Sequence, residues 1–79
     1  MTLEEAAKKA FEKKYKGITG YKIDGKFVDL NCETKAGNVY PARIIFDNTG
    51  THYHAESPHE DLESITDFAE EIKKNLELG

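Results

Sequence analysis

A chain of 79 residues, of which 38% are hydrophobic, is long enough for one small domain, and no linker or internal repeat divides it. Its single cysteine excludes an intrachain disulfide, and its longest apolar run, Ile44–Phe46, is far too short to cross a membrane. The formal net charge is -4, and the whole acidic excess lies in residues 57–79, which contain seven acids and two lysines. This balance argues against direct nucleic-acid binding, which requires a basic surface. The N-terminus has no signal-peptide pattern, so we expect a cytoplasmic protein, or an exported one if a leader was removed.

The first expected element is a helix over residues 2–16. Thr2 and Glu5 have the spacing of a capping box, in which the two residues satisfy each other's backbone amides. Apolar residues then recur at helical spacing and form one stripe: Leu3, Ala7, Ala10, Phe11 and Tyr15. Gly17 suits the left-handed position just past a helix end, so we expect the helix to end at Lys16.

Residues 18–23 and 27–34 predict two strands joined in a hairpin. The Asp-Gly pair between them suits a two-residue type I′ turn, which would place Tyr21 opposite Val28. Because side chains alternate between the faces of a strand, the apolar ones fall on one side: Tyr21, Ile23, Val28, Leu30 and Cys32. The turn and the hydrophobic pattern therefore predict the same hairpin.

Two further strands are expected over residues 39–46 and 51–56. Asp47–Gly50 between them has the composition of a type I turn. Pro41 has no amide hydrogen, so we expect a bulge or an unpaired edge at that position. The inward side chains of these strands would be Tyr40, Ala42, Ile44, Phe46 and Tyr53.

Ser57, Pro58 and Glu60 stand in the order of an N-cap, a first-turn proline and a capping glutamate, so they predict the start of a second helix. Its apolar stripe is Leu62, Ile65, Phe68, Ala69, Ile72 and Leu76. A four-stranded antiparallel meander between two amphipathic helices predicts a two-layer α+β domain over residues 1–79. Its order is α-β-β-β-β-α, with both helices on one face of the sheet.

The order of a helix and two hairpins, with a third strand that ends in Phe46 and Asp47 before a turn containing Gly50, resembles the PepSY and PepSY-like repeat. The resemblance covers residues 3–56, and residues 51–56 match the last short strand of that family. It implies an inhibitory or protein-binding module. Members are usually exported or membrane-tethered, whereas we expect no leader on this chain, which also adds a long acidic helix.

The same order also resembles the double-stranded RNA-binding fold. That family docks RNA through a lysine-rich start of its last helix, but residues 58–63 here contain three acids and no lysine. The charge has the wrong sign for a phosphate backbone. The resemblance therefore implies a similar topology without RNA binding.

His52 and His54 are two residues apart in the fourth expected strand, so their side chains would share a face. Such a pair, together with a carboxylate such as Glu56, is able to bind Zn²⁺ or Ni²⁺. The run has no cysteine pair and no established ligand spacing, so we predict no metal site and no cofactor. The alternative interpretation, metal or small-ligand binding at this histidine-rich strand, ranks third among the functions considered.

The sheet face opposite the apolar one carries the preferred functional surface. Both helices are needed on the apolar side, so this second face should be open to water. It would present apolar, charged and imidazole side chains together: Phe27, Asp29, Arg43, Ile45, His52 and His54. Such a mixture is typical of a protein-binding patch, although Phe27 and Ile45 would also pair across strands in an ordinary sheet. An edge of the third or fourth strand also offers a site for a homodimer.

The second helix offers an acidic surface made of Glu60, Asp61, Glu63, Asp67, Glu70 and Glu71. A row of acids is able to mimic phosphates and occupy the nucleic-acid-binding site of a partner, but it is also what a solvated helix face contains. No motif predicts catalysis, so we expect neither enzyme activity nor catalytic residues. The preferred function is a non-enzymatic protein-binding or inhibitory module that uses the open sheet face, with the acidic decoy as the alternative.

Overall fold

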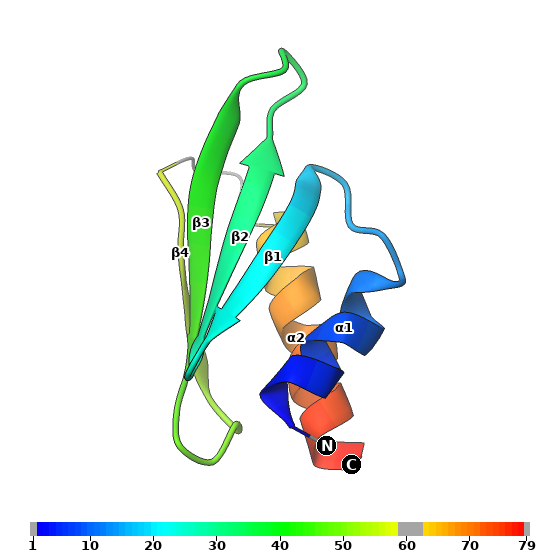
Figure 1. Cartoon of the computed structure of the whole chain (residues 1–79), viewed down its shortest axis with the longest axis vertical. Coiled ribbons are helices and arrows are strands. Elements are labelled where there is room, and N and C mark those ends of the chain that lie inside the picture. The colour runs from blue at the N-terminus through cyan, green and yellow to red at the C-terminus, as the bar shows by residue number, and fades with distance from the viewer. Residues whose placement is uncertain (1, 59–62, 79) are drawn as a thin grey trace.

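A computed structural model describes residues 2–58 and 63–78, which form two helices and a four-stranded sheet (Figure 1). Along the chain the elements are α1 (Leu3–Phe11), β1 (Ile18–Asp24), β2 (Phe27–Glu33), β3 (Val39–Phe46), β4 (Tyr53–Glu56) and α2 (Glu63–Leu78). This order confirms the predicted α-β-β-β-β-α arrangement of an α+β fold. Residues 59–62 lie outside the described part, and with them Leu62 of the predicted apolar stripe and Glu60 of the predicted cap of the second helix.

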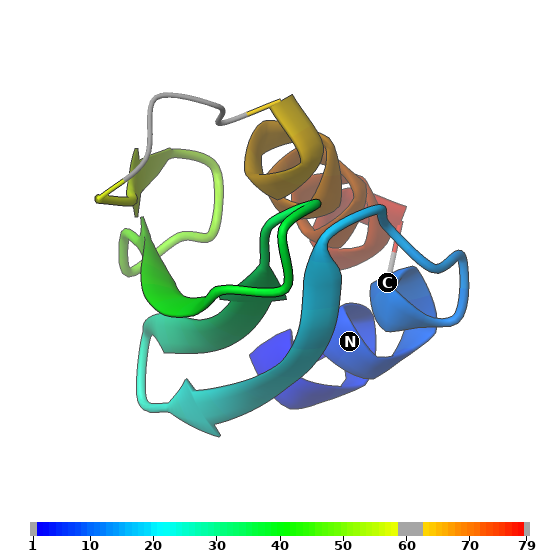
Figure 2. The same cartoon turned by 90° about the horizontal axis from the view of Figure 1, so that it is seen from above.

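The strands lie in the order β1-β2-β3-β4, each antiparallel to its neighbours, as a meander requires. Figure 2 shows the sheet curving around the side on which both helices lie. The ring of Tyr21 on β1 contacts both helices. Its centroid lies 5.1 Å from that of Phe11 on α1 and 6.1 Å from that of Phe68 on α2. The fold therefore has two layers, one of strands and one of helices.

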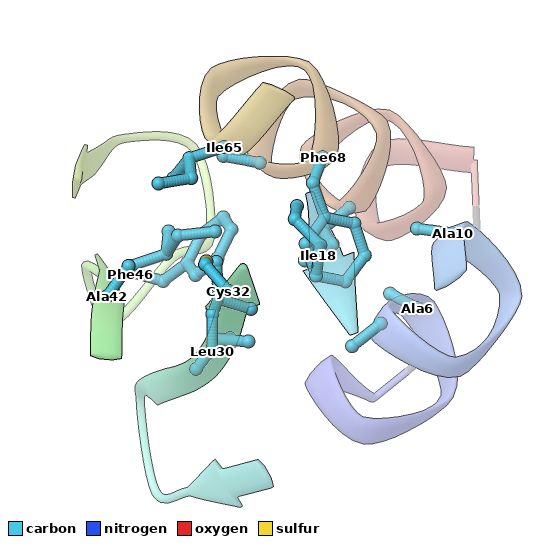
Figure 3. Close-up of a cluster of buried hydrophobic side chains, with 14 residues drawn as sticks. Ala6, Ala10, Ile18, Leu30, Cys32, Ala42, Phe46, Ile65 and Phe68 are labelled. Atoms are coloured by element: carbon cyan, nitrogen blue, oxygen red, sulfur yellow. The ribbon is translucent and has the colours of Figure 1, made fainter. Parts of the chain in front are cut away.

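The core fills the space between the two layers (Figure 3). Alternate residues of the central strands point into it, so Val28, Leu30 and Ile44 are at most 2% exposed. On α1 the buried positions are alanines, whose small side chains let this helix approach its neighbours closely. The buried helix residues are Ala6, Ala7 and Ala10 on α1, and Ile65, Phe68, Ala69 and Ile72 on α2. Each large apolar side chain in this cluster contributes about 1.5–3 kcal/mol on burial.

The first helix is shorter than predicted, because it ends at Phe11 rather than at Lys16. Its capping box of threonine and glutamate is present as expected. The amide of Lys14 bonds to the carbonyl of Phe11, three residues back, and Lys14 then takes a left-handed φ of 53°. This early turn brings the ring of Tyr15 to 5.3 Å from that of Phe68. A contact with the core therefore overrides the helical pattern of the last turn.

The first hairpin differs from its predicted register by two residues. Its turn residues are Gly25 and Lys26, and only the glycine has a positive φ, which is the sign pattern of a type II′ turn. Tyr21 therefore lies opposite Leu30 and not opposite Val28. A shift of two residues keeps every side chain on its predicted face, because side chains alternate with a period of two.

The fourth strand begins at Tyr53, two residues later than predicted, because the amide of Thr51 bonds to the carboxylate of Asp47 in the preceding turn. This shorter strand pairs only with residues 43–46 of β3. Pro41 pairs regularly with β2, and its other side has no strand neighbour among the described residues. The prediction of an unpaired edge at Pro41 is therefore confirmed.

Asn75 on α2 is a core residue that the hydrophobic pattern does not reveal. It is 5% exposed, and its Nδ2 donates a hydrogen bond of 3.1 Å to the carbonyl oxygen of Ala6 on α1. A buried amide needs such a partner, because an unsatisfied one would cost free energy. This bond joins the two helices side by side.

Candidate functional site

The open face is the side of the sheet that points away from the helices. Pairing aligns its side chains in rows that cross the strands. One row alternates in charge from β1 to β4 and contains Lys22, Asp29, Arg43 and Glu56. The next row contains Asp24, Phe27, Ile45 and His54. The structure thus brings five of the six predicted partner-binding residues together, all except His52.

Arg43 links the two rows. Its Nε donates to Oδ1 of Asp29 at 2.7 Å, and its guanidinium carbon lies 5.0 Å from the ring centre of Phe27. The hydrogen bond that Arg43 donates to Asp29 raises the pKa of the guanidinium, so Arg43 stays charged. An ion pair and a cation–π contact together fix the position of the arginine. Its side chain is still 49% exposed, so a partner is able to reach it.

Phe27 and Ile45 are direct cross-strand partners, and both are partly exposed. Their pairing is the ordinary contact expected inside a sheet, and the guanidinium of Arg43 shields part of the aromatic ring. Val39 lies further along β3 on the same face and is 72% exposed. Val39 was not among the predicted partner-binding residues. The sequence could have revealed it, because it lies an even number of positions from Arg43 and from Ile45, which places all three on one face.

A hollow of about 580 Å³ borders the open face beside Arg43. β4 ends at Glu56, and beyond this point the described part of the chain no longer pairs with β3. The hollow lies there, between the unpaired edge of β3 at Pro41 and the residues that follow Glu56. Its polar and proline lining consists of Asp29, Asn31, Pro41, Arg43, Glu56, Ser57 and Pro58. No local sequence pattern predicts this hollow, because it depends on the length of β4.

The two histidines of the fourth strand region occupy different places. His52 precedes β4, and its Nδ1 lies 3.2 Å from Oδ2 of Asp47 in the turn. His54 lies in β4 beside Ile45, and its Nε2 is 3.6 Å from Oε1 of Glu56. Across residues 2–58 and 63–78, no three His, Cys, Asp or Glu side chains gather closely enough to hold a metal ion.

Asp47 organises the turn between β3 and β4. Its carboxylate accepts hydrogen bonds from the amides of Thr49 and Thr51 (both 3.1 Å) and from the Thr49 hydroxyl (3.0 Å). Partial desolvation alone would raise the pKa of Asp47, but hydrogen bonds from Thr49, His52 and Thr51 outweigh it and lower the pKa to about 2. The carboxylate is therefore charged at neutral pH and holds the turn in shape.

The predicted acidic surface is divided. Glu63, Asp67 and Glu70 are exposed on α2, whereas Glu71 forms an ion pair with Lys13, which lowers the pKa of its carboxyl. Two more of its predicted members, Glu60 and Asp61, lie outside the described residues. At least one acid of this surface thus serves to join α2 to the loop after α1.

Cys32 lies inside the core and not in a site. It is 1% exposed, and burial raises the pKa of its thiol despite a hydrogen bond with Tyr40. A buried neutral thiol is a poor nucleophile. Cys32 therefore packs as a small apolar side chain.

Comparison with protein families, with curated proteins and with solved structures finds no match for this chain. The resemblance to PepSY-like domains therefore stays a prediction. Within the described residues, neither helix combines the length and the apolar character that a membrane crossing demands.

Proposed function

We propose that this chain is a non-enzymatic protein-binding module whose contact surface is the open face of the sheet. The observation that supports it most is the cluster of Arg43, Phe27 and Asp29 beside the hollow. Aromatic residues and arginine are the side chains that most often dominate binding energy at protein interfaces. Here they lie on strands, which hold them more firmly than loops would.

The geometry suggests how a partner would dock. Nε of Arg43 is engaged by Asp29, and the remaining N–H donors of a guanidinium are able to bond to a carboxylate or carbonyl of the partner. An apolar side chain of the partner would cover the cross-strand pair of Phe27 and Ile45, and a second one would contact Val39 further along β3. The hollow would accept one further side chain.

The charges on the open face favour a partner of mixed polarity over a strongly charged one. The row from Lys22 to Glu56 alternates in sign and is neutral as a whole. A neutral row exerts little long-range attraction, so contacts at short range would decide affinity. Binding should then depend only weakly on salt concentration.

The test begins with the tagged chain purified gently from its host, with the co-purifying protein identified by native mass spectrometry. The affinity for that protein is then measured for the wild type and for the double variant Phe27→Ser/Ile45→Thr. We expect the double variant to bind at least about tenfold more weakly, as loss of interface hot spots does. Circular dichroism should show that it remains folded.

The double variant Asp67→Asn/Glu70→Gln provides a matched control on α2, because it changes exposed side chains on the helix side of the sheet. It should bind as the wild type does. A complex that is weakened by this control and by salt, but not by the open-face variant, would contradict the proposal and favour the acidic decoy. Unchanged affinity in both variants would also contradict it.

A further inference from the structure

The outer edge of β1 is a second surface with specific features. β1 is the first strand of the sheet order and has no strand neighbour on its outer side among the described residues. The amide of Glu33 on β2 bonds to the carbonyl of Gly17, so odd-numbered amides of β2 face β1. Asp29 is one of these odd-numbered residues, and Lys22 lies opposite it, so the amide and carbonyl of Lys22 point toward β2. Backbone groups alternate in direction along a strand, so those of Tyr21 and Ile23 point outward.

The N-terminal half of β1 is unsuited to pairing with another strand. The register shifts between Ile18 and Gly20, so Thr19 forms a bulge there. Bulges distort the edge and are one way in which proteins prevent unwanted strand pairing. The C-terminal half, from Tyr21 to Asp24, pairs regularly and has no such protection in its backbone. In Figure 1 this half lies at the front of the sheet, clear of the helix ribbons.

The side chains of this half select one way of pairing two copies. Two antiparallel copies of β1 would be related by a two-fold axis, on which one residue faces itself. An axis at Lys22 would place two like charges opposite each other, and an axis at Tyr21 would run the pairing into the bulge at Thr19. An axis at Ile23 instead places Lys22 of each copy opposite Asp24 of the other, so the dimer gains two pairs of opposite charge.

We infer that the C-terminal half of β1 is a self-association edge, on which a second copy of this chain pairs antiparallel about a two-fold axis at Ile23. Both Lys22 and Asp24 are exposed on the open face, at positions where opposed side chains approach closely. On the helix side, the two Ile23 side chains would meet beside an open hollow of about 800 Å³. That hollow, which Leu3 and Tyr21 also line, leaves room between β1 and the start of α1.

The pairing would join the two sheets into one continuous sheet. Because the axis is perpendicular to the strands and to the sheet, the two open faces would lie side by side on the same surface, and the helices of both copies on the other. The contact is short, with few backbone hydrogen bonds, so a weak dimer in the micromolar range or above is expected. Self-association here does not depend on the proposed function of the open face.

Charge reversal tests the pairing. The dissociation constant of the dimer is measured by sedimentation equilibrium at up to about 0.5 mM chain. Lys22→Asp alone, or Asp24→Lys alone, creates two like-charged pairs and should weaken the dimer about tenfold. The double swap Lys22→Asp/Asp24→Lys restores opposite charges and should return the affinity to near that of the wild type. Lys35→Asp, at an exposed position after β2, is the matched control and should have no effect.

A wild type that remains monomeric would overturn the inference, and so would single reversals that leave the dimer unchanged or a double swap that fails to recover it. Circular dichroism confirms that each variant is folded. Cross-linking tests the register independently: an oxidised mixture of Lys22→Cys and Asp24→Cys should form a disulfide-linked dimer, because these positions would be directly opposed. A disulfide formed efficiently by Lys22→Cys alone would place the axis at Lys22 and overturn the assigned register.

Discussion

The two faces of the sheet are built from the same strands, but different forces hold them. On the helix side, Val28 and Ile44 are fully buried among apolar side chains. One residue away, on the open side, Asp29 and Arg43 form an ion pair in contact with water. Apolar burial contributes far more free energy than an exposed ion pair. Stability should therefore depend on the helix side, which leaves the composition of the open side available for binding.

Truncation of Phe68, on the helix side of the sheet, should cause the largest loss of stability. Phe68 is fully buried and contacts the rings of Phe11, Tyr15 and Tyr21. We expect Phe68→Ala to lower the free energy of unfolding by about 3–5 kcal/mol. A chain of this size has only about 4–12 kcal/mol in total, so much of the variant would be unfolded at moderate temperature. Urea denaturation followed by circular dichroism measures the change.

Val39→Ala is the matched control on the open face, because Val39 is 72% exposed. Its free energy of unfolding should stay within about 0.5 kcal/mol of the wild type. If the two variants lost similar amounts, the division of roles between the two faces would be wrong.

Asn75 tests whether the interior depends on apolar packing alone. Asn75→Ala removes the bond to the carbonyl of Ala6 and leaves a small cavity, so we expect a loss of about 1–2 kcal/mol. Asn75→Leu keeps the branched shape of the side chain but removes the bond and adds volume, so it should remain less stable than the wild type in the same urea titration. A leucine variant as stable as the wild type would show that packing alone fixes the position of α2 against α1.

The faces of the strands were predictable from the sequence, because a period of two assigns each side chain to a face whatever the exact pairing. The hairpin illustrates this: its register is shifted by two residues, yet Tyr21 and Ile23 still share a face with Leu30. The capping box at Thr2 was also predictable, since it depends only on neighbouring residues. Local patterns therefore determined the order of elements and most of the candidate surface.

What the sequence did not reveal depends on contacts between distant residues. The early end of α1 follows from the packing of Tyr15 on Phe68, and the burial of Asn75 depends on a carbonyl 69 residues away. The position of His52 follows from the turn that Asp47 organises, which removes this histidine from β4. The hollow beside Arg43 depends on where β4 stops.

The loss of the Asp47 carboxylate should have the smallest effect on stability, and this effect should depend on pH. The pKa of Asp47 is about 2 in the folded chain and 3.8 ordinarily. Between these values the unfolded chain binds more protons, so stability rises with pH there. The contribution of the Asp47 carboxylate to the free energy of unfolding should be complete above about pH 5 and should be lost as the pH falls toward 2. This dependence separates the charged surface from the apolar interior, whose contribution does not titrate.

Asp47→Asn removes the charge but keeps the size of the side chain. An NH2 group replaces Oδ2, the oxygen that faces the Thr51 hydroxyl and Nδ1 of His52, and the neutral Oδ1 is a weaker acceptor for the amides of Thr49 and Thr51, so the variant should melt below the wild type at pH 6. The difference in melting temperature should shrink steadily as the pH is lowered from 5 toward 2. Other carboxylates with lowered pKa values, such as those of Glu5 and Glu71, are present in both proteins and cancel in the comparison. A difference that stays constant over this range would mean that the charge of Asp47 does not hold the turn, and that the shape of the side chain is sufficient.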